Sequence, residues 1–270
     1  MKKVVFLTGN ELRHFFIHNY LINSKINLLK TYSEKSDKDI KIRLGNHYKK
    51  SKILKSHFKL RKESEKAYFK SINKKKLRKI KYIKKGEINS EKVFKELVKL
   101  KPDLIISYGC SLIHSNIIQK FKRKIINVHL GLSPYYRGSG TNIWSLINKE
   151  PYLFGVTFMI IDKGVDTGKI LQQYRAKINK NDSPHDIGNR LIYNIPMYLE
   201  KIVSKYNYKN FYKKVKIVPT KKKYYTTRDF TEEKCKKLYS NFENNLIDKY
   251  LKNRNQILYK FPIVQRRIFL

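Results

Sequence analysis

The sequence predicts an α/β protein in which a mostly parallel β-sheet is flanked by helices. Two observations carry this prediction. Short β-branched apolar runs alternate with segments whose apolar residues recur at helical spacing, and turn residues separate them. Alternation of buried strands with helices is typical of βαβ units. The 270 residues, 41% of them hydrophobic, are enough for one large domain or for one domain with an appendage.

The expected elements follow in chain order. Strands are predicted at residues 4–7, 26–32, 104–109, 125–129 and 155–161, with an extended segment at 169–178. Helices are predicted at residues 11–23, 91–100, 113–121, 142–148, about 182–204 and 231–252. Ser90 and Thr231 are candidate N-caps, and Pro184 suits a first helical turn. Residues 215–227 are expected to form a hairpin.

Residues 45–83 form a basic segment with a helical period, whose predicted buried face includes Leu54, Phe58 and Phe69. The whole chain has 61 Lys and Arg against 21 Asp and Glu, a net charge of +40. Such an excess suits nucleic acid, anionic lipid or anionic substrates. The alternative is compositional drift, with the basic helix simply solvated. We favour this alternative because no base-stacking pattern accompanies the lysines.

Several classes of protein are disfavoured. Gly9 is the single glycine of the turn after the first strand, so the three-glycine dinucleotide fingerprint is absent. His14 and His18 would share a helix face without a third ligand in view, so we expect packing or surface roles and no metal. Cys110 and Cys235 show neither metal nor disulfide spacing, which favours a reducing, cytoplasmic compartment. We expect the N-terminus to be a strand rather than a signal peptide, and no membrane span.

Polar side chains stand at two predicted strand ends. Asn127 and His129 alternate along one strand and therefore point to the same face, and Asp166 lies in the turn after another strand. Acyl transfer to an amine needs donors for a developing oxyanion, which an amide and a protonated imidazole can supply. A nearby carboxylate would raise the pKa of the histidine, orient its ring and shuttle a proton. Spacing alone leaves open a purely structural role for these buried groups.

An ordered set of motifs lies between about residues 102 and 172: Asn127-Val128-His129, Leu132-Ser133-Pro134, Tyr136-Arg137-Gly138, Gly155-Val156-Thr157 and Asp162-Lys163-Gly164-Val165-Asp166-Thr167-Gly168. Together these motifs resemble the 10-formyltetrahydrofolate-dependent formyltransferase family. That family includes glycinamide ribonucleotide, methionyl-tRNA and nucleotide-sugar N-formyltransferases. The resemblance implies a Rossmann-like sheet, with Asn127, His129 and Asp166 as the catalytic amide, imidazole and carboxylate. The chain departs from the family at Leu130, where proline is common, and its first half matches poorly.

The resemblance also implies the binding residues. The formyl donor would be 10-formyltetrahydrofolate, held by Ser107, Tyr108, Gly109, Cys110, Ser111, Leu112, Asp162, Gly164 and Val165. The amine is expected beside Asn10, Arg137 and Gly138, where the Arg137 guanidinium could hold a phosphate or the acidic tail of folate. Since the donor is already activated, Cys110 is interpreted as a packing residue. Residues 1–205 would form the catalytic domain, and residues 206–270 a C-terminal extension with a hairpin and a helix.

We therefore expect an enzyme that moves a formyl group to a primary amine of a small molecule, with a nucleotide-linked amino sugar as the leading acceptor. The tRNA enzymes of the family carry a C-terminal barrel, and the residues after 206 are too few for one. Three alternatives stay open: methionyl-tRNA formylation, hydrolysis of the formyl donor, and a basic nucleic-acid-binding protein that keeps the fold without the activity. A homodimer is also left open.

Overall fold

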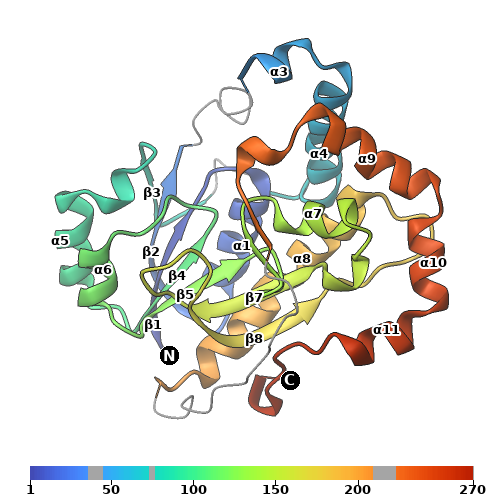
Figure 1. Ribbon diagram of the computed structural model, residues 1–270. Helices are drawn as coiled ribbons and strands as arrows, with labels where there is room; N and C mark the ends of the chain where they lie inside the picture. The colour runs from blue at the N-terminus through green and yellow to red at the C-terminus, as the bar shows by residue number, and fades with distance from the viewer. Residues whose placement is uncertain (36–44, 73–76, 209–222, 270) are drawn as a thin grey trace.

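A seven-stranded sheet with the order β3-β2-β1-β4-β5-β7-β8 forms the centre of the molecule (Figure 1). The computed structural model describes residues 1–35, 45–72, 77–208 and 223–269. The strands of the sheet are β1 (Lys3–Thr8), β2 (Asn27–Glu34), β3 (Ile80–Ile83), β4 (Leu104–Tyr108), β5 (Ile125–His129), β7 (Gly155–Ile160) and β8 (Lys169–Arg175). β3, β2, β1, β4 and β5 are parallel, and β7 runs antiparallel to β5 and β8. The predicted mostly parallel sheet is confirmed.

The helices cover both faces of this sheet. They are α1 (Leu12–Asn23), α3 (Gly45–Lys50), α4 (Lys52–Tyr68), α5 (Glu91–Leu100), α6 (Ser115–Lys120), α7 (Thr141–Ile147), α8 (Pro184–Lys205), α9 (Glu232–Glu243), α10 (Leu246–Lys252) and α11 (Arg254–Lys260). α5 and α6 pack on one face, whereas α1, α7, α8, α9 and α10 belong to the core on the other face (Figure 1).

Side-chain alternation along the strands divides the core in two. Val5 and Leu7 of β1 pack towards α5 and α6, and Val4 and Phe6 pack towards α1 and α8. All four side chains are fully buried. A strand that buries both faces needs a continuous apolar run, which is why β1 shows no polar alternation in the sequence.

The helix signals read from the sequence agree with the structure. Ser90 and Thr231 accept hydrogen bonds from the backbone N–H of Val93 and Lys234, and so cap α5 and α9. Ser183 caps α8 in a capping box, and Pro184 occupies its first turn.

Two expectations about the basic segments are wrong. The helical period predicted at 45–83 ends at α4, because β3 pairs with β2 as the edge strand of the sheet. The helix predicted at 231–252 is broken after α9, where Asn245 takes a left-handed conformation with φ 60°, and α11 follows α10. Of the hairpin predicted at 215–227, residues 215–222 lie outside the described residues. β9 (Lys223–Tyr225) pairs in parallel with β6 (Tyr136–Gly138).

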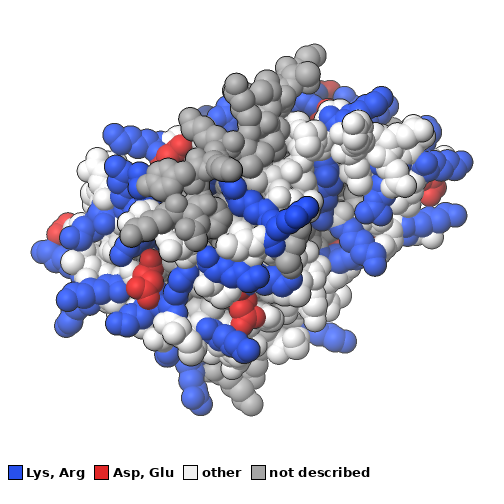
Figure 2. Space-filling view, turned by 90° about the horizontal axis from the view of Figure 1, so that it is seen from below, with Lys and Arg blue, Asp and Glu red and all other residues white. Residues whose placement is uncertain are grey.

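The basic side chains are distributed over the surface. Figure 2 shows Lys and Arg spread across a whole face of the molecule, with a few acidic side chains between them. In the described part of the chain, no helix combines the length and the apolar character that crossing a membrane requires.

The strand order creates a crevice above the sheet. The chain runs outward from β1 through β2 to β3 and returns to β4 on the other side of β1. Neighbouring connections therefore diverge at the carboxyl ends of β1 and β4, which is where open α/β sheets bind ligands.

Candidate active site

A cavity of about 1090 Å³ opens at the carboxyl ends of β1, β4 and β5. Its inner walls come from four parts of the chain. The turn after β1, the loop after β4, the end of β5 and the loop between β7 and β8 form the inner walls. The helices α4, α7 and α8 and the segment after β9 complete the rim. Ligand pockets usually measure roughly 300–1,000 Å³, so this cavity lies at the upper end of that range.

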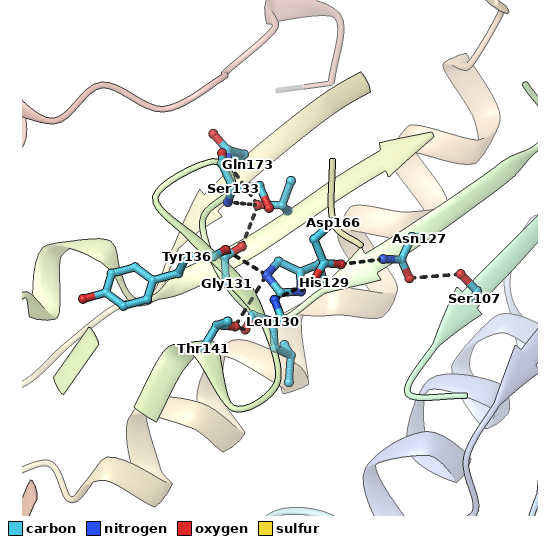
Figure 3. Close-up of polar contacts among 12 residues, drawn as sticks. Ser107, Asn127, His129, Leu130, Gly131, Ser133, Tyr136, Thr141, Asp166 and Gln173 are labelled. Atoms are coloured by element: carbon cyan, nitrogen blue, oxygen red, sulfur yellow. Dashed lines mark hydrogen bonds and ion pairs between the residues drawn. The ribbon is translucent and has the colours of Figure 1, made fainter. Parts of the chain in front are cut away.

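Four side chains form a continuous hydrogen-bond chain at the base of the cavity (Figure 3). Ser107 Oγ donates to Asn127 Oδ1 at 3.0 Å, and the two residues are partners in the β4–β5 register. Asn127 Nδ2 donates to Asp166 Oδ1 at 3.3 Å. Asp166 Oδ2 lies 3.3 Å from His129 Nδ1. Because Asp166 can only accept when ionised, the amide of Asn127 must present its nitrogen to the carboxylate.

Asp166 reaches this position through an unusual backbone conformation. Its φ is 53°, in the left-handed region that Asp tolerates better than most residues. The backbone N–H of Gly138 donates to Asp166 Oδ2 at 2.9 Å. Gly138 itself has φ 94°, and a Cβ there would lie 2.0 Å from the Tyr225 carbonyl oxygen. Glycine is therefore required where the β6–β9 pair approaches the carboxylate.

Oxygen atoms surround the His129 imidazole. Nε2 lies 3.1 Å from the Tyr136 carbonyl oxygen and 3.5 Å from Thr141 Oγ1, and the Thr141 hydroxyl donates to the Leu130 carbonyl. Burial lowers the pKa of His129, while the Asp166 charge and the Tyr136 carbonyl oppose the shift. The Asp166 carboxylate thus acts on the pKa of His129 in the expected direction, but burial outweighs it because the ring is only 7% exposed and desolvation disfavours its charged form.

A buried hydroxyl fixes the turn that follows His129. Thr157 Oγ1 donates to the Gly131 carbonyl at 2.6 Å and accepts from the Ser133 N–H at 3.0 Å and from Gln173 Nε2 at 2.9 Å. Strands β7 and β8 thus hold the turn in place through one atom. A Cβ at Gly131 would lie 2.5 Å from His129 Nε2, so the turn also requires glycine to pass the imidazole.

The loop after β4 is held by a buried carboxylate. Glu34, only 1% exposed, accepts from the backbone N–H groups of Ser111 at 2.7 Å and Gly86 at 2.9 Å, and pairs with Lys85 at 3.2 Å. The loop presents Leu112, 70% exposed, at the cavity wall. Burial first, and then the Glu34 charge, raise the pKa of the Cys110 thiol to about 12. Cys110 is therefore protonated at neutral pH, as a packing residue would be.

The cavity brings together most of the residues predicted from the sequence. Its walls include Asn10, Ser107, Tyr108, Gly109, Cys110, Ser111, Leu112, Asn127, His129, Gly138, Asp162, Gly164, Val165 and Asp166. Arg137 lies on β6 outside the lining residues, so its contact with substrate stays a prediction. Within the described residues, no cluster of three or more His, Cys, Asp or Glu side chains could hold a metal ion.

Other residues of the site were not found from the sequence. Thr157 lies in one of the quoted motifs, but its role as the anchor of the turn needs the β7–β8 pairing. Glu34 lies far from these motifs in the sequence, and Thr141 is the first residue of α7. No local sequence pattern marks either residue as part of the site. Arg61 and His57 of α4 line the cavity although their helix was expected to be solvated.

The arrangement provides the parts that acyl transfer to an amine requires. Asn127 Nδ2 has two N–H groups, and among the described residues only Asp166 accepts from them. The second N–H is thus available to an oxygen in the cavity. The two ring nitrogens of His129 face Asp166 Oδ2 and the Tyr136 carbonyl oxygen. When the neutral imidazole accepts a proton, each of its N–H groups therefore has an acceptor.

Comparison with known proteins places this site in a family. Finegoldia magna methionyl-tRNA formyltransferase is 35% identical over 121 residues, which are 44% of this chain and 38% of the relative. Brucella melitensis GDP-perosamine N-formyltransferase is 32% identical over 118 residues, covering 43% of this chain and 45% of the relative. These matches therefore span less than half the length of either relative.

Solved structures share the fold. Phosphoribosylglycinamide formyltransferase from Anaplasma phagocytophilum aligns with a TM-score of 0.55 at 14% identity, over 83% of this chain and 98% of that chain. An N-formyltransferase from Helicobacter canadensis, in complex with folinic acid and dTDP-3-aminofucose, aligns with a TM-score of 0.54 at 22% identity, over 86% of this chain and 73% of that chain. The formyl transferase family model matches residues 2–203. The chain, with its Asn127, His129 and Asp166 at one cavity, belongs to the formyl transferase family.

Proposed function

We propose that this protein transfers a formyl group from 10-formyltetrahydrofolate to the primary amine of a nucleotide-linked amino sugar. The observation that carries the proposal is the hydrogen-bonded series Asn127–Asp166–His129 at the base of one cavity. An amide donor, a carboxylate and a buried imidazole meet there, and the neighbouring Ser107 and Thr141 hydroxyls donate to Asn127 Oδ1 and to the Leu130 carbonyl rather than to the imidazole. Direct attack by an amine on an activated acyl group needs no thiol or hydroxyl nucleophile.

Each of the three side chains has a distinct role in the proposed reaction. When bound, 10-formyltetrahydrofolate supplies an activated formyl group. The second N–H of Asn127 Nδ2 donates to the formyl oxygen as negative charge develops on it, a contribution of about 3–4 kcal/mol for a well-placed donor. His129 accepts the proton that the attacking amine loses and returns it to the donor nitrogen as the bond between that nitrogen and the formyl carbon breaks, so that tetrahydrofolate leaves. Asp166 orients the imidazole and stabilises the imidazolium that forms, because its Oδ2 faces Nδ1.

The loop after β4 and the loop between β7 and β8 suit the formyl donor. Both line the same cavity beside Asn127, and Leu112 offers an exposed apolar side chain against which a flat pterin ring can pack. Glu34 fixes the Ser111 backbone in that loop. The donor would thus occupy the side of the cavity nearest α6.

A nucleotide-linked amino sugar is the proposed acceptor for two reasons. The Brucella relative is named for GDP-perosamine, and the Helicobacter structure contains dTDP-3-aminofucose. The cavity also extends past the turn after β1 to α4, α8 and the segment after β9. This part of the cavity lies beyond the loops assigned to the donor and leaves room for a second substrate.

Methionyl-tRNA is the second candidate acceptor. The Finegoldia relative is a methionyl-tRNA formyltransferase, and the net charge of +40 would favour RNA. Against it, the described residues from 223 onwards form β9 and the helices α9, α10 and α11 rather than the several strands of a small barrel.

The two candidates are separated by an acceptor panel. Wild-type protein is incubated with 10-formyltetrahydrofolate and, in parallel, GDP- and dTDP-linked amino sugars, the same sugars without nucleotide, and methionyl-tRNA. Formylated product is quantified by mass spectrometry. Turnover of a nucleotide-linked sugar supports the proposal, whereas turnover of methionyl-tRNA alone would replace it with the second candidate.

A further inference from the structure

The single arginine of α4 points away from the lysines of the same helix. The exposed basic residues of α4 are Lys52, Lys55, Lys59, Lys62 and Lys66. Arg61 is half-buried and lines the cavity, together with His57 and Glu65 of the same helical face. The inner face of this basic helix is therefore part of the site, and its outer face is solvated.

Arg61 has no counter-charge of its own. Both oxygens of the nearby Glu65 carboxylate are held by Arg13, Oε1 by the backbone N–H at 3.1 Å and Oε2 by Nη1 at 2.7 Å. Arg13 also pairs with Glu11. Among the described residues, none forms a hydrogen bond or an ion pair with the Arg61 guanidinium. Burial, followed by the charge of Arg13, lowers the pKa of Arg61 to about 10, against the opposing charges of Glu65 and Tyr108.

The imidazoles of His57 and His185 lie next to Arg61 and are neutral at neutral pH. His185 at the start of α8 is 7% exposed, and its buried Nε2 has no hydrogen-bond partner within the described residues. Its ring centroid lies 4.8 Å from that of His57, whose Nδ1 is 2.9 Å from the Tyr239 hydroxyl. Burial and the charge of Arg61 lower the pKa of His185 to about 4, so the ring is neutral at neutral pH. An unpaired guanidinium and an unpaired imidazole thus line the same part of the cavity.

We infer that Arg61, with His185 beside it, binds the diphosphate of the nucleotide-linked acceptor. A guanidinium presents its N–H donors in a planar fork that matches phosphoryl oxygens, and an anion would supply the charge that Arg61 lacks. α4 and α8 lie on the α1 side of the sheet, whereas the loop assigned to the formyl donor leads into α6 on the other side. The anion site therefore belongs to the acceptor. This inference rests on the proposed function for its choice of acceptor.

The test compares Arg61→Gln with Arg61→Lys and with Lys62→Gln, a matched change at the exposed neighbour. GDP and inorganic pyrophosphate are titrated into each protein by calorimetry, and KM is measured for the nucleotide-linked sugar and for the donor. Arg61→Gln is expected to weaken GDP and pyrophosphate binding, and to raise KM for the sugar nucleotide, by roughly 10- to 100-fold. KM for the donor is expected to stay unchanged. Arg61→Lys recovers part of the binding, and Lys62→Gln stays within about twofold of wild type.

Two outcomes overturn the inference: Arg61→Gln binding GDP and pyrophosphate as wild type does, or wild type binding neither. Thermal unfolding of each variant confirms that the protein is folded. The proposed function fails separately. If wild type binds GDP through Arg61 but formylates no amine, the anion site stands and the transferase assignment falls. If wild type formylates sugar nucleotides and Arg61→Gln leaves their KM unchanged, the transferase assignment stands and the anion site falls.

Discussion

Asp166 Oδ2 lies 3.3 Å from His129 Nδ1, and both side chains are at least nine-tenths buried. The contact joins the end of β5 to the loop between β7 and β8, and it influences the pKa of the imidazole. Burial lowers the pKa of His129, and the carboxylate limits the shift. An imidazole that is neutral in the resting site can serve as a base, and the adjacent carboxylate stabilises the product of proton transfer.

Replacing His129 by Ala is expected to reduce formyl transfer by about 10²- to 10⁴-fold, the usual contribution of a general base. KM for the donor should change little because its proposed binding loops are untouched. Steady-state kinetics with the preferred sugar nucleotide measures both quantities, and circular dichroism reports the fold. Undiminished turnover in a folded variant would remove His129 from the mechanism.

Changing Asp166 to Asn removes the charge that opposes burial at His129. The pKa of His129 should then fall further below its ordinary value of 6.5, and the acid limb of kcat/KM should move to lower pH. The maximal rate should also drop, because the imidazolium loses its counter-charge. A pH–rate profile of wild type and variant checks the direction. An acid limb displaced to higher pH contradicts the electrostatic role given to Asp166.

Thr157→Val removes the hydroxyl that holds the turn after His129. The change leaves the Ser133 N–H, the Gly131 carbonyl and Gln173 Nε2 without this partner. Gln173 Nε2 keeps its bond to the Ser133 carbonyl, so two groups are left unsatisfied. A loss of about 2–6 kcal/mol in the free energy of unfolding is expected, from roughly 1–3 kcal/mol for each of them. Thr157→Ser keeps the hydroxyl and serves as the matched control. Urea denaturation showing equal losses in both variants would mean that packing of the methyl group matters more.

Glu34→Gln weakens the carboxylate contacts to the backbone of Ser111 and Gly86. We expect a raised KM for the formyl donor with a smaller effect on KM for the acceptor, because Glu34 positions the loop after β4. Glu243→Gln changes an exposed carboxylate of α9 and is the control. A variant with normal KM for the donor would show that the loop keeps its shape without the charge.

Three buried histidines make the stability depend on pH. Burial lowers the pKa of His18 and His185 to about 4 and of His57 to about 3, from 6.5. Below 6.5 the unfolded chain therefore binds more protons than the folded protein, and the free energy of unfolding falls as the pH falls towards 4. The slope reaches about 1.4 kcal/mol per pH unit for each histidine. Urea denaturation at fixed ionic strength measures it, and His18→Gln should lessen the slope. A stability that is constant or rises on acidification contradicts this.

Much of the fold could be predicted because buried strands leave a clear apolar pattern. The strands β1, β4 and β5 were predicted from their short apolar runs. Asn127 and His129 were predicted as site residues because side chains alternate along a strand, which places these two on the same face at its end. β3 was missed, since Ile80–Ile83 is short, includes Lys81 and lies in a basic region with a helical period. Its pairing with β2 is a tertiary contact that overrides local propensity.

The site was harder to predict where it depends on helix orientation and burial. The sequence shows Arg61 among lysines, and only the packing of α4 against α8 and α9 turns it towards the cavity. The pKa of His129 is lowered because the ring is deeply buried, and the depth of burial cannot be read from the residue types. Glu34 reaches the loop after β4 from β2 because the sheet order places β2 beside β1 and β1 beside β4.

The most direct test is formyl transfer to a GDP- or dTDP-linked amino sugar by wild type and by Asn127→Ala, measured with 10-formyltetrahydrofolate at matched protein concentration. Wild type should form the formamido product, and Asn127→Ala should lose about 10²- to 10³-fold in kcat, the effect of deleting one oxyanion donor. A wild-type protein that formylates no nucleotide-linked amine, or a folded Asn127→Ala variant with full kcat, would contradict the mechanism.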